Sequence, residues 1–504
     1  MVNSTNEFLV EYNTLDENSR YKITGFSGSA GDALITPETI YLFVDGRYHI
    51  QADQEVDHSE VTVVKLQQGQ SYIDEIIQRV PKDEILGIFS KKISQRNIEL
   101  LNRKLNIRLL EYDPLDGKIS KSDDQNIELD IKFTGLSAEE KINKISQNLK
   151  EYESLYITDL DEVSYLFNMR NFSQNFSAKI KAKAVIFKDS YVLFTDEKLQ
   201  ELENYLRNLK GTVFIDKSSI SGFDYRLLGS HATEMKINPV KQMKAQKTTA
   251  EIEHLKDAFA RSDKALSTVR DFILKKRKVS EREIAKKLEK EFKNNGALGL
   301  SFNSIVAKDS NSALAHYSKA SKDEIIQNGS LVLIDCGAYF EGGLATDMTR
   351  VFVKGEPSQL QKRIYTLVLK AFLHAYNYAQ VYNDKPITGF DIDKKIRDFF
   401  HGFNLDGFVF NHGLGHGIGI NVHEYPPNLG TGDIAKVPLL DGECFSIEPG
   451  LYKEGFFGIR LENSCYFKDG NIHSFSNMNY EQKLIDEDLL TQQEKDWLNE
   501  FEVK

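Results

Sequence analysis

The sequence predicts an α/β protein, in part α+β, that contains more than one domain. At 504 residues the chain exceeds the length at which a single hydrophobic core usually stops growing. Two N-terminal stretches alternate short apolar runs with helical patterns. A longer C-terminal region combines long amphipathic helices with strand-like runs. The composition, 40% hydrophobic and 28% charged, is typical of a globular protein.

Charge and apolar patterning argue against several kinds of partner. The net charge is −11 and no basic stripe offsets it, so we expect no nucleic-acid partner. No apolar run reaches the roughly 18 to 20 residues of a membrane helix, and the N-terminus lacks a secretory pattern. Cys336, Cys444 and Cys465 have no CxxC spacing and lie in apolar contexts. We therefore expect buried free thiols, no membrane partner and a cytoplasmic location.

The first domain is predicted over residues 1–118. Its segment GFSGSAGDALI (residues 25–35) leads into the alternating run TIYLFVDGRYHIQA (residues 39–52), which predicts a strand with a hairpin tip at DGR. On this pattern alone, Arg47 is an ordinary turn residue. The remaining expected elements are strands at 84–89 and 107–110 and a helix over 94–105.

A second α/β domain is predicted over residues 119–236. It follows a polar stretch, residues 113–132, whose composition suits a linker. Its element content resembles that of the first domain, so the two domains can be a divergent duplication. We expect helices at 136–148 and 161–170, and strands at 155–157, 184–187, 191–194 and 213–215.

The third domain is predicted over residues 237–475, with a helical C-terminal extension over 476–504. Capping boxes at Thr248/Glu251 and Ser280/Glu283 start two amphipathic helices that we interpret as scaffold. Further strands are expected at 302–307, 330–334, 348–353, 444–448 and 458–466, and further helices at 359–381, 392–400 and 487–501.

The stretch Asn411–Asn428 contains three of the chain's eleven histidines, His412, His416 and His423, separated by glycines. Imidazole is the commonest protein metal ligand. Glycine at this density indicates tight turns or backbone that approaches a ligand closely. Taken alone, the stretch is more typical of a flexible loop whose histidines are solvated.

Carboxylates at strand ends favour a metal site. Asp335 ends the strand LVLI and Asp347 opens the next strand, so an antiparallel hairpin would bring them together. Two carboxylates that close repel each other unless they are protonated or bound to a cation. Glu448 ends another strand, and in GIRLEN the alternation puts Arg460 and Glu462 on one face.

Four carboxylates and one imidazole suit two hard divalent ions, Mn²⁺ above all, with Zn²⁺ or Co²⁺ as alternatives. Two such ions about 3.5–4 Å apart can hold a hydroxide and polarise a carbonyl, which suits amide hydrolysis without a covalent intermediate. The sequence contains no GxSxG, Walker A or HExxH motif that would indicate another hydrolase class.

The segments DCGAYFEGGLATDMTR, HGLGHGIG, VHEYP, SIEPGLY and GIRLEN, in this order, resemble aminopeptidase P, the proline-specific branch of the pita-bread metallopeptidases. GFSGSAGDALI, VDGRYHIQA and DEVSYLFNMR extend the resemblance over almost the whole chain. It implies two creatinase-like α/β domains, a pita-bread catalytic domain and a homodimer. The implied activity is hydrolysis of the N-terminal Xaa-Pro bond, in peptides with proline in the second position, by a metal-bridging hydroxide.

The resemblance also implies a role for each candidate residue. Asp347 and Glu462 would bridge the two metal ions, and Glu448 would be the general base. The implied metal ligands are Asp335, Asp347, His416, Glu448 and Glu462. The implied substrate-side residues are His316 near the leaving group or oxyanion, His423 at the scissile peptide, and His412, Tyr452, Arg460 and Arg47 around the peptide.

Two departures from the family pattern and three alternatives remain. The spacing from Asp335 to Asp347 is one residue longer than usual, which predicts a bulge around Gly342–Leu344. The first domain is N-terminally short by comparison. A prolidase acting on Xaa-Pro dipeptides is the nearest alternative. A catalytically inactive binding module or a creatinase-like metal-free hydrolase fits less well, since all five ligands are present.

Overall fold

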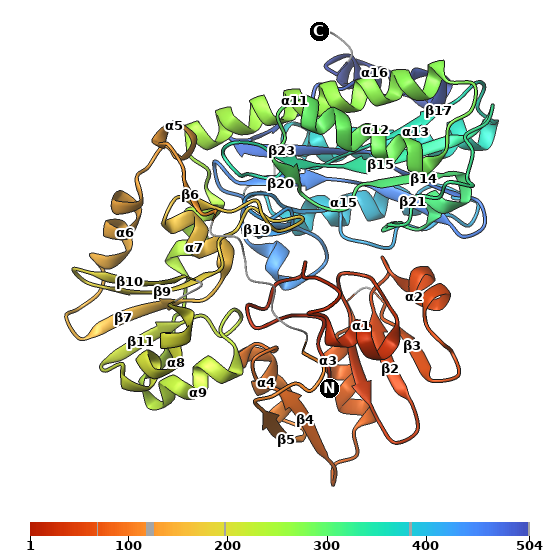
Figure 1. The fold of residues 1–504 in the computed structure, drawn as a ribbon. Coiled ribbons are helices and arrows are strands. Elements are labelled where there is room, and N and C mark those ends of the chain that lie inside the picture. The colour runs from red at the N-terminus through yellow and green to blue at the C-terminus, as the bar shows by residue number, and fades with distance from the viewer. Residues whose placement is uncertain (68, 117–124, 196–197, 383–385, 502–504) are drawn as a thin grey trace. The chain divides into compact units, whose positions relative to one another are not determined.

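A computed structural model describes residues 1–67, 69–116, 125–195, 198–382 and 386–501 (Figure 1). Part of the predicted linker, residues 117–124, lies outside the described residues. The chain forms two compact units. The first contains Met1–Leu129, Leu136–Ser173 and Lys179–Gln242, and the second contains Asp130–Gly135, Gln174–Ala178 and Met243–Lys504.

The first sheet of the first unit consists of β1 (Asp32–Ile35), β2 (Ile40–Val44) and β3 (Val61–Lys65). Strand β2 is antiparallel to β1 but parallel to β3, so a crossover has to connect β2 to β3. Helix α2 (His49–Glu55) lies in this connection. The predicted hairpin tip at DGR was therefore wrong. Asp45 Oδ1 accepts the backbone N–H of Arg47 at 3.0 Å, which closes a strand-to-helix turn.

Three other predicted elements of this first domain form. Strands β4 (Ile85–Phe89) and β5 (Asn106–Leu110) pair in parallel, and Ser94 caps α4 (Gln95–Asn102). The short helices are α1 (Ser19–Thr24) and α3 (Tyr72–Arg79).

The second sheet of the first unit has the order β10-β9-β7-β11-β12. Its strands are β7 (Glu153–Ile157), β9 (Ala182–Phe187), β10 (Tyr191–Thr195), β11 (Thr212–Ile215) and β12 (Ala232–Glu234). Its helices are α6 (Ala138–Ser146), α7 (Leu160–Leu166), α8 (Leu199–Asn208) and α9 (Gly222–Leu228). The predicted helix at 161–170 ends early, because Met169–Arg170 forms β8 and pairs with β6 (Ile127–Glu128).

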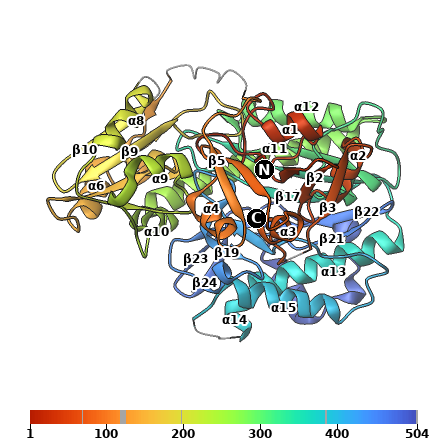
Figure 2. The ribbon, with the colours of Figure 1, turned by 90° about the horizontal axis from the view of Figure 1, so that it is seen from below.

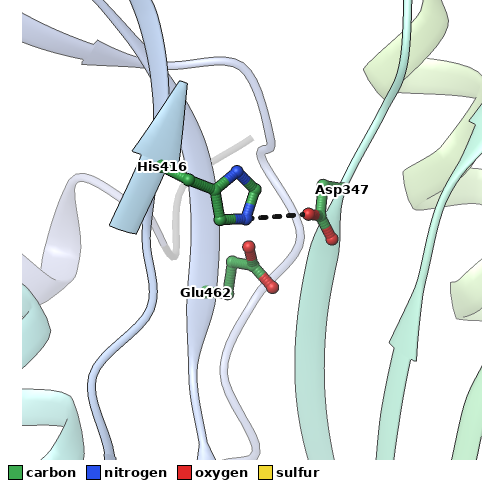
Figure 3. Close-up of side chains that lie close together, drawn as sticks. All are labelled: Asp347, His416 and Glu462. Carbon is green, nitrogen blue, oxygen red and sulfur yellow. Dashed lines mark ion pairs between the residues drawn. The ribbon is translucent and has the colours of Figure 1, made fainter. Parts of the chain in front are cut away.

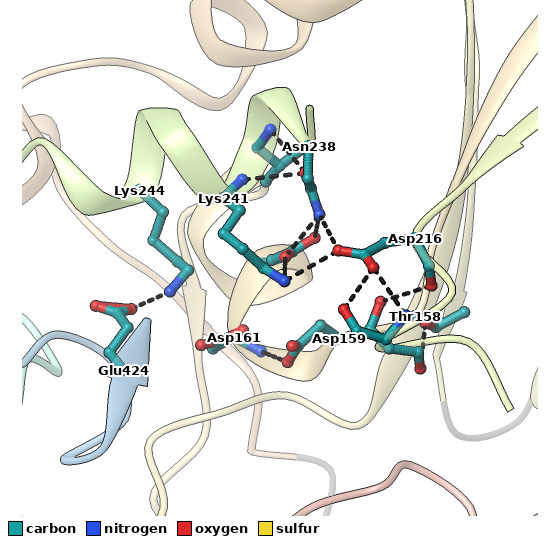
Figure 4. Close-up of polar contacts among 12 residues, drawn as sticks. Thr158, Asp159, Asp161, Asp216, Asn238, Lys241, Lys244 and Glu424 are labelled. Atoms are coloured by element: carbon teal, nitrogen blue, oxygen red, sulfur yellow. Dashed lines mark hydrogen bonds and ion pairs between the residues drawn. The ribbon is translucent and has the colours of Figure 1, made fainter. Parts of the chain in front are cut away.

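Polar side chains close the carboxyl ends of β7 and β11 (Figure 4). Lys241 Nζ lies 3.0 Å from Asp216 Oδ2 and 3.7 Å from Glu162 Oε1. The amide of Asn238 donates to both of these carboxylates. Burial acts to raise the pKa of Asp216. The charge of Lys241 and the hydrogen bonds from Ser218 outweigh burial and lower this pKa to about 2. These contacts fix Asn238, which directly precedes α10 (Pro239–Ala245).

The second unit contains an eight-stranded sheet of order β14-β15-β17-β23-β20-β18-β19, with β24 beside β23. Its strands are β14 (Ile305–Lys308), β15 (Leu331–Cys336), β17 (Met348–Val353), β18 (Gly415–Gly417), β19 (Glu424–Leu429), β20 (Cys444–Ile447), β23 (Glu462–Lys468) and β24 (Asn471–Ser474). Its pairs are antiparallel.

Helices cover both faces of this sheet, as Figure 2 shows for α11 and α12 on one side of β17 and α13 and α15 on the other. Val332 and Ile334 pack with α11 (Thr249–Lys275) and α12 (Glu281–Asn294). Leu331 and Leu333 pack with α13 (Gln359–Tyr376) and α15 (Gly389–His401). Alternate residues of β15 therefore enter two different cores, and Asp335 continues the row of Leu331 and Leu333.

Both predicted capping boxes form, at the starts of α11 and α12. The expected strand 458–466 divides into β22 (Phe457–Arg460), which pairs with β21 (Gly450–Lys453), and β23. The expected helix 359–381 divides at Asn377 into α13 and α14 (Tyr378–Tyr382). The C-terminal helix α16 (Gln492–Asn499) forms as expected.

The three cysteines are free and buried, which confirms the expected thiols. Within the described ranges, no helix combines the length and apolar character needed to cross a membrane.

Candidate metal centre

Three adjacent strands place acidic side chains in one row. Asp335 of β15 lies opposite Thr349 of β17, and Thr349 lies opposite Glu462 of β23. Asp347 precedes Thr349 by two residues, so the pleat turns it to the same face. The hydroxyl of Thr349 donates to Glu462 Oε2 at 2.6 Å. The hairpin thus brings Asp335 and Asp347 to a common face with Glu462.

The connection between β15 and β17 accommodates its extra residue in the turn. The pairs Cys336–Met348 and Tyr339–Ala345 belong to one uninterrupted register, so residues 340–344 form the turn. Gly343 has a φ of 63°, which glycine adopts without strain, and its N–H donates to Phe340 O at 2.8 Å. The longer spacing therefore leaves both aspartates on the same face.

Strand β18 brings His416 to these acids (Figure 3). One donor atom each of Asp347, His416 and Glu462 lie within 4.8 Å of one another. His416 Nε2 is 3.5 Å from Asp347 Oδ2 and 3.3 Å from Glu448 Oε1. Glu448 directly follows β20, the strand that pairs with β18. Oxygen and imidazole donors at this separation suit divalent cations.

Two carboxylate oxygens of the centre accept no hydrogen bond from any described residue. They are Asp335 Oδ1 and Glu462 Oε1, and both are buried. The second oxygen of Asp335 accepts from Arg460 Nη2 at 2.5 Å. A buried carboxylate oxygen without a partner is costly, and a bound cation would satisfy it. The residues present therefore fit a divalent-metal site.

Burial and mutual repulsion raise the pKa values of three acids here. The pKa of Asp347 lies well above its ordinary value. Burial is the largest cause, and repulsion from Glu462 and Asp335 raises it further. The pKa of Glu462 rises through burial and then through Glu448 and Asp335. Burial raises the pKa of Glu448 to about 7, against the attraction of Arg460. Without a cation, the centre would hold protons that a metal has to displace.

The hydrogen bonds of His416 suit a metal ligand. Its Nδ1 lies 3.1 Å from Gly417 O, so an Nδ1–H donates to that carbonyl. In this tautomer the lone pair on Nε2 faces Asp347 and Glu448. A lone pair that faces carboxylates is repelled unless a proton or a cation lies between them. A backbone carbonyl that orients the imidazole in this way is the usual companion of a histidine ligand.

The glycines of this stretch serve close packing of the chain against itself. Neither Gly415 nor Gly419 has a positive φ. A Cβ on Gly415 would lie 1.9 Å from Ser446 O, and one on Gly419 would lie 1.7 Å from Glu424 Oε2. Glu424 is itself buried, and its carboxylate binds Lys244 (Figure 4) and also Lys247. Both glycines therefore allow close packing within the chain, while an approach of this backbone to a ligand stays a prediction.

Gly419→Ala is expected to destabilise the protein by about 1–3 kcal/mol, because the methyl group would collide with the buried Glu424 carboxylate. Urea unfolding would measure the loss. Gly432→Ala is the matched control, since its Cβ would meet nothing nearer than 3.9 Å, and a change within about 0.5 kcal/mol is expected there. Equal stability of the two variants would contradict the packing role of Gly419.

A chain of hydrogen bonds links His412 to the acids. Arg460 Nη1 donates to the hydroxyl oxygen of Tyr452 at 2.8 Å. The Tyr452 hydroxyl lies 2.9 Å from His412 Nε2, and His412 Nδ1 lies 2.7 Å from Gly413 O. With Nδ1–H donating to that carbonyl, Tyr452 O–H donates to Nε2. Arg460, which also binds Asp335, thus orients Tyr452 and His412.

The remaining candidates lie in three places. The ring of His423 meets that of His416 edge-on, with centroids 4.5 Å apart. His316 lies in the loop that follows a 3₁₀ turn, Asp309–Ala313. Arg47 lies in the first unit, where Nε and Nη2 bind the Asp45 carboxylate at 2.9 and 2.7 Å. The substrate roles of all three residues stay predictions.

The sequence interpretation missed residues that orient the ligands. Thr349 binds Glu462, and alternation from Asp347 could have identified it. The Ser446 hydroxyl donates to Glu448 Oε1 at 3.3 Å and accepts the His416 N–H at 3.1 Å, and it too lies two residues from a ligand. Asp393 accepts the N–H of Leu414 at 3.0 Å, but no local signal on α15 indicates this contact.

Comparison with known proteins agrees with this geometry. Residues 253–469 match metallopeptidase family M24, and residues 8–121 and 118–251 each match a creatinase/prolidase N-terminal domain. A "Probable Xaa-Pro aminopeptidase P" of Sordaria macrospora is 30% identical over 567 residues, which cover 99% of this chain and 91% of that protein.

Two solved structures have related folds. An X-prolyl aminopeptidase from Caenorhabditis elegans, a cytosolic enzyme with a di-nuclear active site, has a TM-score of 0.88 at 22% identity, covering 99% of this chain and 90% of that chain. The prolidase from Pyrococcus horikoshii has a TM-score of 0.56 at 26% identity, covering 69% of this chain and 99% of that chain. The chain therefore belongs to metallopeptidase family M24, in the aminopeptidase P branch that carries two creatinase-like N-terminal domains before a pita-bread domain.

Proposed function

We propose that this protein is an aminopeptidase that uses two divalent metal ions to hydrolyse the bond between an N-terminal residue and a following proline. The observation that carries the proposal is the convergence of Asp347, His416 and Glu462. Beside them, two buried carboxylate oxygens lack a hydrogen-bond donor among the described residues. The names of the Sordaria and Caenorhabditis relatives support the choice of reaction.

Asp335, Asp347, His416, Glu448 and Glu462 would hold the two ions. Asp347 and Glu462, between the other ligands, would bridge them. When bound, the ions would supply a bridging hydroxide as nucleophile and polarise the scissile carbonyl. Mn²⁺ is the proposed metal because the donor set is rich in oxygen, with Zn²⁺ or Co²⁺ as alternatives.

Glu448 is the proposed general base. Its pKa, about 7 in the absence of a cation, suits a group that exchanges protons near neutral pH. Its carboxylate would accept the proton released on attack and return it to the leaving proline nitrogen. That nitrogen has no hydrogen in the peptide, so it has to gain a proton to leave as an amine.

The histidines and Arg460 would position the peptide. His423, against the ring of His416, is proposed to contact the scissile peptide at its proline side. His316 is proposed to stabilise the leaving group or the oxyanion. His412 and Tyr452, oriented by Arg460, would form the pocket wall. Arg47 is proposed as a peptide contact on the basis of the family resemblance alone.

A prolidase that cleaves Xaa-Pro dipeptides is the second candidate, since the Pyrococcus prolidase matches over 99% of its length. That match covers 69% of this chain, and the two creatinase-type domains here favour the aminopeptidase. The test is to strip the protein of metal, add Mn²⁺, and compare an Xaa-Pro-Xaa tripeptide with an Xaa-Pro dipeptide.

The tripeptide is expected to be cleaved with a kcat/KM at least about tenfold above that of the dipeptide. Xaa-Ala-Xaa is the control for proline specificity. Cleavage of the dipeptide alone would assign the prolidase activity. Absence of both activities and of bound metal would favour an inactive binding module.

We further propose a cytoplasmic homodimer with domain boundaries at 1–118, 119–236, 237–475 and 476–504. The three buried free thiols suit a reducing compartment. The dimer rests on the family resemblance alone, and light scattering would test it.

A further inference from the structure

The carboxylate of Glu281 is fully buried at the first residue of α12. It takes no part in capping that helix, because Ser280 and Glu283 form the capping box between them. Burying a carboxylate is costly unless hydrogen bonds compensate for the lost water. The partners of Glu281 therefore indicate which part of the structure this carboxylate stabilises.

Four hydrogen bonds converge on Glu281. Its Oε1 accepts the backbone N–H of Lys308 at 2.7 Å and the amide of Asn311 at 2.9 Å. Its Oε2 accepts the hydroxyl of Tyr317 at 2.7 Å and the backbone N–H of Ser321 at 2.9 Å. A carboxylate offers about four acceptor sites, so these four bonds use its full capacity. All four donors are uncharged, so none of these four hydrogen bonds is an ion pair.

All four donors belong to one segment, residues 308–321. This segment runs from the end of β14 (Figure 1) through the 3₁₀ turn Asp309–Ala313 and contains His316. Glu281 therefore joins both ends of the segment, Lys308 and Ser321, and also holds Tyr317, the residue next to His316. The amide of Asn311 bonds to the Tyr317 hydroxyl at 3.2 Å and closes the network within the segment.

A second anchor fixes the same segment to the strand that leads into the metal centre. The Ser312 hydroxyl oxygen accepts the Gly458 N–H at 2.8 Å and also lies 3.0 Å from Gly458 O. Gly458 lies in β22, two residues before Arg460, which binds Asp335. His316 thus lies between Ser312 and Tyr317, both of which are held in place.

We propose that Glu281 is a positioning residue that holds His316 in the place from which it meets the peptide. The inference rests on the proposed function for the role of His316, and on the four hydrogen bonds for the anchoring. Glu281 itself touches no metal ligand through these bonds. Its effect on turnover passes through the 308–321 segment.

Glu281→Gln is the test substitution. The amide NH₂ replaces one acceptor oxygen, and in either orientation it faces two donors of the segment, so two of the four hydrogen bonds are lost. Hydrogen–deuterium exchange of residues 308–321 is expected to accelerate about tenfold or more. Glu283→Gln is the matched control, because it makes the same chemical change two residues away in the capping box, and it should leave exchange in this segment unaltered.

Kinetics separate positioning from general destabilisation. With Mn²⁺ and an Xaa-Pro-Xaa tripeptide, Glu281→Gln is expected to lower kcat/KM by roughly ten- to a hundredfold. His316→Ala should lower it as well, and the double variant should be no worse than about threefold below His316→Ala. A residue that acts only on overall stability would lower kcat/KM by the same factor whether or not His316 is present.

Unchanged exchange in Glu281→Gln overturns the anchoring, whatever the activity. If exchange accelerates but the double variant loses kcat/KM by the product of the two single-variant factors, the link from Glu281 to His316 is overturned. If the wild-type protein with Mn²⁺ cleaves no Xaa-Pro peptide, the proposed function fails and the link to the peptide fails with it, while the exchange result still decides the anchoring.

Discussion

Replacing Glu448 by glutamine is expected to lower kcat on Xaa-Pro peptides by about 10³-fold or more, while the fold is retained. General acid–base catalysis alone contributes about 10²–10⁴-fold, and Glu448 is also a proposed metal ligand. Its carboxylate lies 3.3 Å from His416 Nε2, and its pKa of about 7 allows proton exchange at neutral pH. An amide of the same shape cannot accept that proton.

The measurement is kcat with Mn²⁺, together with metal content and the melting temperature. Glu443→Gln is the matched control, a buried glutamate directly before β20 whose Oε2 accepts the N–H of Leu440 at 3.0 Å. The control should keep its activity. A Glu448→Gln enzyme that retained more than about a tenth of kcat would exclude Glu448 as the base.

Local patterns predicted those parts of the fold that local interactions determine. Both capping boxes formed, because each of them joins residues only three apart in the sequence. The DGR segment was interpreted wrongly, since alternation continues across it while the chain turns from β2 into a helix. Whether the chain forms a hairpin or a strand-to-helix turn at this point depends on the parallel pairing of β2 with β3. The local sequence pattern gives no information about that pairing.

The acidic residues of the centre could be identified from sequence because they stand at strand ends. Period-two alternation then put Asp347 on the face that Asp335 and Glu462 share. Alternation along a strand could not predict the packing around these acids. The need for glycine at 419 comes from its contact with Glu424. The hydrogen bonds of Glu281 come from a segment about thirty residues further along the chain. On its own helix, Glu281 is an ordinary acidic residue of the first turn.

The stability of the metal-free protein, relative to the metal-loaded protein, is expected to fall as pH rises from about 5 to about 7. In this window the folded metal-free centre binds more protons than the unfolded chain, because burial and repulsion raise the pKa values of Asp347, Glu448 and Glu462. Unfolding then releases protons, so a higher pH favours unfolding. Glu448 alone, with a pKa raised from 4.5 to about 7, accounts for a loss on the order of 3 kcal/mol.

Bound Mn²⁺ should remove this dependence, because the cation replaces the protons as the neutralising charge. Melting temperatures of stripped and Mn²⁺-loaded protein at pH 5, 6, 7 and 8 would measure it, and the metal-induced increase should grow with pH. Comparing loaded with stripped protein cancels the titration of every group outside the centre. Glu462→Gln removes one of the repelling acids, so the stripped variant should lose less stability between pH 5 and 7 than the stripped wild type. A metal-induced increase that shrinks as pH rises would show that these carboxylates do not share a cation.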